Sequence, residues 1–151
     1  MSTAFAHIVC CIDSSDAAAT ALDHASALRE LVGGRLTVLH VVAPPPFLVS
    51  FAATLGGAPV HDDIAEREAA EMWLEETASN VPGGAEAVLL EGSPGETACD
   101  WAAEAEADVM VAASHRGAVE RMMLGSFANY LTHHAPCPLL LIPPARGAHG
   151  S

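Results

Sequence analysis

Short runs of mostly apolar residues alternate along the chain with longer amphipathic stretches. An apolar run without alternation is typical of a strand that is buried on both faces, as in a parallel sheet covered by helices. The sequence contains five such runs: His7–Ile12, Leu36–Val42, Ala87–Leu90, Asp108–Ala112 and Leu139–Ile142. We therefore expect five strands in one parallel sheet.

The stretches between these runs carry apolar residues at helical spacing. The first ends at Gly33-Gly34, a pair typical of a helix end. Ser93, Pro94 and Glu96 are typical of a helix start with a capping box. The predicted helices are Asp16–Val32, Asp62–Ala78, the segment from Ser93 to about Ala107, and Ser126–His134.

This alternation predicts the fold class. Strands and helices that take turns along a chain form right-handed crossover units. We therefore expect an α/β protein, a single-domain, doubly wound five-stranded parallel sheet of Rossmann-like type. The 151 residues fit one domain. We place that domain at residues 1–143 and expect a flexible tail at 144–151.

The segment 43–60 is too long and too apolar for a plain connector. Three successive prolines open it, and several large apolar residues follow them. One interpretation is a lid or a surface that contacts a protein partner. The alternative is a short helix packed on the core.

The last predicted strand, Leu139–Ile142, has prolines on both sides. Proline is tolerated mainly on edge strands, and a short uncharged edge is prone to aggregation unless something covers it. Pairing with the same strand of a second chain would cover this edge. We therefore predict a homodimer joined through Leu139–Ile142.

Charge and composition exclude several classes of protein. The net charge is −13, with six arginines and no lysine, so nucleic acid is not an expected partner. The missing lysine also excludes a Schiff-base lysine and the lysine of an ATPase phosphate loop. No apolar run is long enough for a membrane span, and no signal peptide is recognised, so a cytoplasmic location is expected. The four cysteines are interpreted as free buried thiols.

The candidate ligand site lies at the carboxyl ends of the predicted strands, where ligands bind in open parallel sheets. Asp13 follows the first strand, Val41 ends the second, and Ala113–Gly117 follows the fourth. Gly125-Ser126 opens the last helix, with Ser126 expected as its N-cap. Free amides at that helix start suit a phosphate group.

These segments resemble the universal stress protein family. The resemblance covers about His7 to Pro143 and rests on Ile8–Ser15, Leu39–Val42, Glu91–Pro94, Ala112–Gly117, Leu124–Ser126 and His134–Ile142. It implies an adenine nucleotide alpha hydrolase-like fold and homodimers joined through the last strand. It also implies ATP or AMP with Mg as the cofactor in members that bind nucleotide, and none in members that do not.

Nucleotide-binding members of that family carry two glycines separated by two residues, then nine residues and Gly-Ser or Gly-Thr. In such members an aspartate after the first strand and a valine of the second strand also hold the nucleoside. Asp13, Val41 and Gly125-Ser126 match these features. Ala113 replaces the first glycine and Arg116 the second, and only eight residues separate Arg116 from Gly125. The resemblance therefore implies a nucleotide site of degenerate pattern, made of Asp13, Val41, Ala113, His115, Arg116, Gly117, Gly125, Ser126 and Phe127.

Two functions stay open at this point. The first is a stress-response module that binds ATP, ADP or AMP. The second is a non-nucleotide-binding member that acts as a homodimeric protein-interaction module, with 43–60 as its partner surface.

Catalysis and metal binding are not expected. Ser126, His115 and Asp13 would lie near one another, but the chain has no G-x-S-x-G motif to activate a serine. We assign no catalytic residue and expect slow ATP hydrolysis at most. The adjacent His133 and His134 would point about 100° apart on a helix, and no Cys/His set has zinc spacing, so no metal site is assigned.

Overall fold

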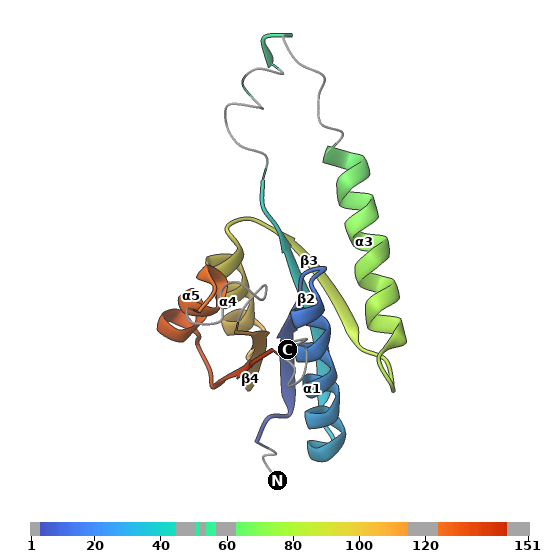
Figure 1. The fold of residues 1–151 in the computed structure, drawn as a ribbon, viewed down its shortest axis with the longest axis vertical. Coiled ribbons are helices and arrows are strands. Elements are labelled where there is room, and N and C mark those ends of the chain that lie inside the picture. Colours follow the sequence, from blue (N-terminus) through green and yellow to red (C-terminus); the bar gives the residue numbers. More distant parts are fainter. Residues whose placement is uncertain (1–3, 45–50, 52–53, 57–62, 115–123, 145–151) are drawn as a thin grey trace, which may run out of the picture.

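The computed structural model describes residues 4–44, 51, 54–56, 63–114 and 124–144 (Figure 1). Most of segment 43–60 and the tail after 144 lie outside these residues. The strands and helices follow one another in the predicted alternation. They are β1 (His7–Cys11), α1 (Asp16–Val32), β2 (Arg35–Val42), α3 (Asp63–Asn80), β3 (Glu86–Glu91), α4 (Pro94–Glu104), β4 (Val109–Ala113), α5 (Ser126–His134) and β5 (Leu139–Ile142).

The five strands form one sheet in the order β3-β2-β1-β4-β5, and all neighbouring strands are parallel. The chain moves outward from β1 through β2 to β3, then crosses back to β4 and on to β5. Right-handed crossovers in opposite directions place their helices on opposite faces. Accordingly, α1 and α3 cover one face, and α4 and α5 cover the other (Figure 1). The predicted doubly wound sheet is confirmed.

The sheet separates two apolar cores, which explains the uninterrupted apolar runs. Neighbouring residues of a strand point to opposite faces. Cys10 therefore belongs to the core under α1 and α3, while Cys11 belongs to the core under α4 and α5. Cys10, Cys11 and Cys99 are free and buried, as predicted, but Cys137 is only half-buried.

The observed end of α1 agrees with its sequence prediction, and the observed end of α4 does not. Gly33 has a positive φ of 69° and its N–H donates to the Arg29 carbonyl, which ends α1 where predicted. The prediction for α4 was wrong by about one turn, because the helix ends at Glu104 rather than near Ala107. Glu106 has a φ of 55°, so the backbone turns away from the helix there.

A buried polar chain lies at the amino-terminal end of the sheet. The His7 side chain is buried, and its Nδ1 lies 3.1 Å from the Arg35 guanidinium, which can only donate. Nδ1 is therefore the acceptor, and Nε2–H donates to the Thr37 hydroxyl at 2.9 Å. That hydroxyl in turn donates to the Glu86 carboxylate at 3.4 Å. The network holds the His7 ring neutral.

Acid is expected to destabilise the protein through His7. Burial, and then the Arg35 charge, lower the pKa of His7 in the folded state. The unfolded chain therefore binds the proton first, so this stabilisation is present above about pH 6.5 and is lost as the pH falls through the folded-state pKa. Urea unfolding of the wild type at about pH 7.5 and 5.5, compared with His7→Gln, isolates the contribution of this residue.

The Gln side chain keeps a donor and an acceptor but does not titrate. The variant should lose less stability on acidification than the wild type, by up to about 1.4 kcal/mol per pH unit. Equal losses in both proteins would contradict the role given to His7, because the many carboxylates titrate in both.

Candidate functional site

A cavity of about 480 Å³ opens at the carboxyl ends of β1, β2 and β4. Here β1 and β4 are neighbouring strands, but the chain continues from β1 to β2 on one side and from β4 to β5 on the other. Doubly wound sheets bind ligands at such a point. His115, Arg116 and Gly117 lie outside the described residues. The other six residues predicted for the site all line the cavity: Asp13, Val41, Ala113, Gly125, Ser126 and Phe127.

Backbone hydrogen bonds bring the end of β4 and the start of α5 together. The N–H of Gly125 donates to the Ser114 carbonyl at 3.0 Å, and the N–H of Ser114 donates to the Ile142 carbonyl at 2.9 Å. A Cβ built on Gly125 would approach only the Ser114 oxygen, at 3.8 Å. The glycine therefore leaves the amino end of α5 open to the cavity.

Asp13 has a structural role that is visible directly. Its Oδ1 accepts a hydrogen bond from the Ser15 N–H at 2.8 Å. Ser15 in turn caps α1, because its hydroxyl accepts from the Ala18 N–H at 3.2 Å. The half-buried Asp13 thus braces the turn after β1 while its side chain borders the cavity.

The helix starts at this edge agree with the predicted caps only in part. Gly125, not Ser126, is the N-cap of α5, and no side chain caps that helix. Ser93 is the N-cap of α4, but its side chain makes no cap hydrogen bond, so the predicted capping box with Glu96 is not formed. Ser93, Gly95, Gly125 and Ser126 all line the same cavity. Two helix starts without side-chain caps therefore face one space.

His40, on β2, is a hydrogen-bonded histidine at the edge of the core. It is half-buried, its Nδ1 lies 2.7 Å from the Ile12 carbonyl, and its ring packs edge-on against Trp73 at 5.1 Å. Nδ1 must carry the hydrogen, because a carbonyl only accepts. His40 also lines the cavity, which its place beside Val41 at the end of β2 would have indicated.

Two further elements of the cavity were missed in the sequence. Ser93, Pro94 and Gly95 line it from the start of α4, and Tyr130 lines it from α5. The signal for the first was available, since Ser93 follows β3 at the same edge of the sheet. Desolvation and the Glu96 carboxylate raise the pKa of Tyr130, so its phenol is a hydrogen-bond donor at neutral pH.

The cavity suits binding better than nucleophilic catalysis. Burial, with the neighbouring Cys99 and Cys137 thiols, raises the pKa of Cys11 to about 12, so the thiolate nucleophile is not formed at neutral pH. No arginine lines the cavity within the part of the chain that the structure describes. An anion there would be held by backbone amides and hydroxyls. Among the described residues, no group of three or more His, Cys, Asp or Glu side chains could hold a metal ion.

Helices long and apolar enough to cross a membrane are absent from the described residues.

Comparisons with known proteins agree on one family. The model of the universal stress protein family matches residues 4–143. The "universal stress protein in QAH/OAS sulfhydrylase 3′ region" of Thermus aquaticus is 31% identical over 142 residues, which cover 91% of this chain and 98% of that protein.

Solved structures are similar over the whole domain. The universal stress protein UspA from Lactobacillus plantarum has a TM-score of 0.67 and 25% identity, covering 91% of this chain and 97% of that one. The universal stress protein from Archaeoglobus fulgidus in complex with dAMP has a TM-score of 0.62 and 24% identity, covering 92% and 98%. At 24% identity, the likeness to the Archaeoglobus fulgidus protein is evidence of a shared fold alone.

Proposed function

This chain belongs to the universal stress protein family, and we propose that it binds an adenine nucleotide in the cavity between the end of β1 and the start of α5. The observation that carries the proposal is the convergence of the uncapped starts of α4 and α5 on that cavity. Free amides and the partial positive charge of a helix start favour a phosphate group.

Each described residue of the site has a proposed part in binding. The amides of Gly125 and Ser126 would donate to phosphate oxygens. The Asp13 carboxylate would accept hydrogen bonds from ribose hydroxyls, and the backbone of Val41 would contact the base. Ala113 and Phe127 would form apolar walls. The dAMP bound by the Archaeoglobus fulgidus protein supports this class of ligand.

Nucleotide binding should raise thermal stability. A ligand that binds only the folded protein stabilises it by mass action, by about 1.4 kcal/mol when its concentration is roughly ten times Kd. The experiment titrates ATP, ADP and AMP, each with magnesium, and follows thermal unfolding. Inorganic triphosphate at equal ionic strength is the control for a general anion effect. Unchanged unfolding at millimolar ATP, ADP and AMP would rule out the proposal.

We also propose that the protein is a homodimer joined through β5. This strand is an edge of the sheet, and the Leu140 side chain on it is 39% exposed. Replacing Leu140 with Arg should convert dimer to monomer in sedimentation velocity, because a charge at a paired edge opposes association. A wild-type protein that sediments as a monomer at micromolar concentration would overturn this proposal.

The protein-interaction alternative rests on a different observation. Phe51 and Leu55 in segment 43–60 have 52% and 71% of their surface exposed. A contiguous patch of exposed apolar side chains is typical of a partner surface. This function would gain support if nucleotide leaves thermal unfolding unchanged.

A further inference from the structure

The pairing of β1 with β2 stops one hydrogen bond early, beside the candidate site. The Ile12 N–H still donates to the Leu39 carbonyl at 2.9 Å, and the last pair of the ladder is Cys11 with Leu39. In a parallel ladder the next bond would run from the Val41 N–H to the Ile12 carbonyl. That bond is not formed. The Ile12 carbonyl accepts instead from Nδ1–H of the His40 side chain, at 2.7 Å.

Val41 therefore keeps a free N–H at the cavity. Neighbouring residues of a strand direct their backbone groups to opposite sides, and the Val42 carbonyl accepts from the Gly92 N–H on the β3 side. The N–H and carbonyl of Val41 thus point to the β1 side, where the ladder has ended. Neither group is hydrogen-bonded to a described residue. Because Val41 is half-buried and lines the cavity, its N–H is a donor available to a ligand.

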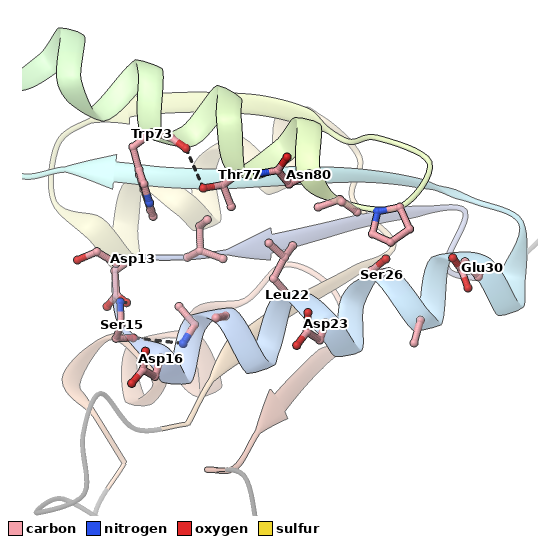
Figure 2. A pocket seen from close by; sticks show the side chains of 17 residues that line it. Asp13, Ser15, Asp16, Leu22, Asp23, Ser26, Glu30, Trp73, Thr77 and Asn80 are labelled. Carbon is pink, nitrogen blue, oxygen red and sulfur yellow. Dashed lines mark hydrogen bonds between the residues drawn. The ribbon is translucent and has the colours of Figure 1, made fainter. Parts of the chain in front are cut away.

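The His40 ring is held in the orientation that its hydrogen bond requires. It meets the Trp73 ring of α3 edge-on, with the ring centroids 5.1 Å apart. Trp73 lines a second cavity, of about 550 Å³, and Figure 2 shows its side chain directed from α3 toward the turn that carries Asp13. Ile12 and Asp13 line both cavities. The contact of His40 with Trp73 therefore lies between the two cavities and fixes the imidazole against the end of β1.

The Ile12 carbonyl needs a donor, because Ile12 is only 7% exposed and buried backbone carbonyls are almost always hydrogen-bonded. Two donors could supply this bond: the His40 side chain, and the Val41 N–H if the ladder were one bond longer. Since the imidazole supplies it, the backbone donor is not used by the fold. Without the imidazole, we expect the ladder to extend and the Val41 N–H to bond to the Ile12 carbonyl.

We propose that His40 is a positioning residue of the nucleotide site: it bonds the Ile12 carbonyl and so keeps the Val41 N–H free to donate to a ring nitrogen of the base. This inference rests on the proposed function, in which the backbone of Val41 contacts the base. Adenine presents a ring nitrogen beside an amine, which matches the free N–H and carbonyl of Val41. Hypoxanthine presents a ring N–H beside a carbonyl, so it would leave these groups unpaired.

Two substitutions separate the hydrogen bond of His40 from the packing of its ring. His40→Phe keeps an aromatic edge against Trp73 and removes the donor. His40→Asn removes the ring and keeps a donor, because its side-chain nitrogen is bonded to Cγ as Nδ1 of histidine is. We expect His40→Phe to raise the Kd for the adenine nucleotide about five- to tenfold, the loss of one hydrogen bond, and His40→Asn to stay within about twofold of the wild type.

Calorimetric titrations use whichever of ATP, ADP and AMP stabilises the wild type most, and the inosine nucleotide with the same number of phosphates. In His40→Phe the ratio of the inosine Kd to the adenine Kd should fall toward one, because only adenine loses the bond to Val41. A general loss of folded protein would raise both Kd values alike. The matched control is His24→Phe, since His24 Nδ1 also donates to a backbone carbonyl, at 2.9 Å, from an exposed position on α1. Its Kd values should equal those of the wild type.

Amide hydrogen exchange tests the same inference without ligand. In the isotope-labelled full chain, the Val41 N–H should exchange with solvent at least about fivefold more slowly in His40→Phe than in the wild type, because the extended ladder then uses it. The Gly92 N–H, which donates to the Val42 carbonyl at 3.0 Å, is the internal reference and should exchange alike in both proteins.

Two results would overturn the role of His40 while leaving the proposed function in place. The first is nucleotide binding by the wild type with an equal Kd in His40→Phe. The second is an equal loss of affinity in His40→Phe and His40→Asn, which would assign the effect to the ring. Failure of the wild type to bind ATP, ADP or AMP would instead rule out the proposed function. The exchange rates would then decide alone, and equal rates for the Val41 N–H in the wild type and His40→Phe would overturn the role of His40 as well.

Discussion

Leu131→Ala lowers the free energy of unfolding by about 2–5 kcal/mol, enough to unfold a marginal domain. The Leu131 side chain is fully buried where α5 packs on the sheet, in the same core as Val9, Leu39 and Met110. Its removal takes apolar surface out of the core and leaves a hole that neighbours cannot fill, because protein interiors are close-packed. Urea denaturation with circular dichroism measures the change.

The chain offers a closely matched control for this prediction. Leu31 is also a helical leucine, but 85% of its surface is exposed. Leu31→Ala should change stability by less than about 0.5 kcal/mol, because no cavity forms and alanine is a good helix former. Similar losses in the two variants would mean that α5 does not pack as described.

Gly125→Val raises the Kd for the adenine nucleotide at least about tenfold, which corresponds to about 1.4 kcal/mol. A side chain at position 125 meets only the Ser114 oxygen, at 3.8 Å, and otherwise projects into the cavity. The two methyl groups of valine would then occupy space beside the uncapped amides of α5, where the phosphate is proposed to bind. Calorimetric titration with the nucleotide that stabilises the wild type gives the two Kd values.

Gly125→Ala separates this steric effect from the helix start. The N-cap preference for glycine is lost in both variants, so both should lose similar stability. Alanine adds one methyl group in ordinary contact and should weaken binding less than valine does. Equal Kd values for the wild type and Gly125→Val would place the nucleotide elsewhere.

Local signals were sufficient for most of the secondary structure. The bounds of α1, α5 and β5 agree with the prediction, because Gly33, Pro136 and Pro143 interrupt regular structure within the sequence itself. The end of α4 lacked such a residue, and there the prediction was one turn too long. Ser93 was predicted correctly as an N-cap, but the capping box with Glu96 was wrong. The cap predicted at Ser126 was also wrong, because Gly125 takes that position.

The candidate site was located from the sequence but not completed. Parallel strands end at one edge, so Asp13, Val41 and Gly125 were expected to meet, and all three line the cavity. His40 and Tyr130 were not expected there. Histidine and tyrosine occur both in cores and at cavities. Which of the two such a residue faces depends on how neighbouring elements pack, and the spacing of apolar residues along the chain does not reveal that.

The sequence by itself determined the sheet, its covering helices and the edge at which a ligand would bind. The spacing of apolar residues reflects which positions are buried, and right-handed crossovers restrict how the strands can be arranged. Only the tertiary structure decided which distant groups share a space. It brought Ser93 and Tyr130 to the same cavity as Asp13 and joined His7, Arg35 and Glu86 in one polar chain. Those arrangements depend on ångström-scale packing between elements, and a one-dimensional pattern carries no such distances.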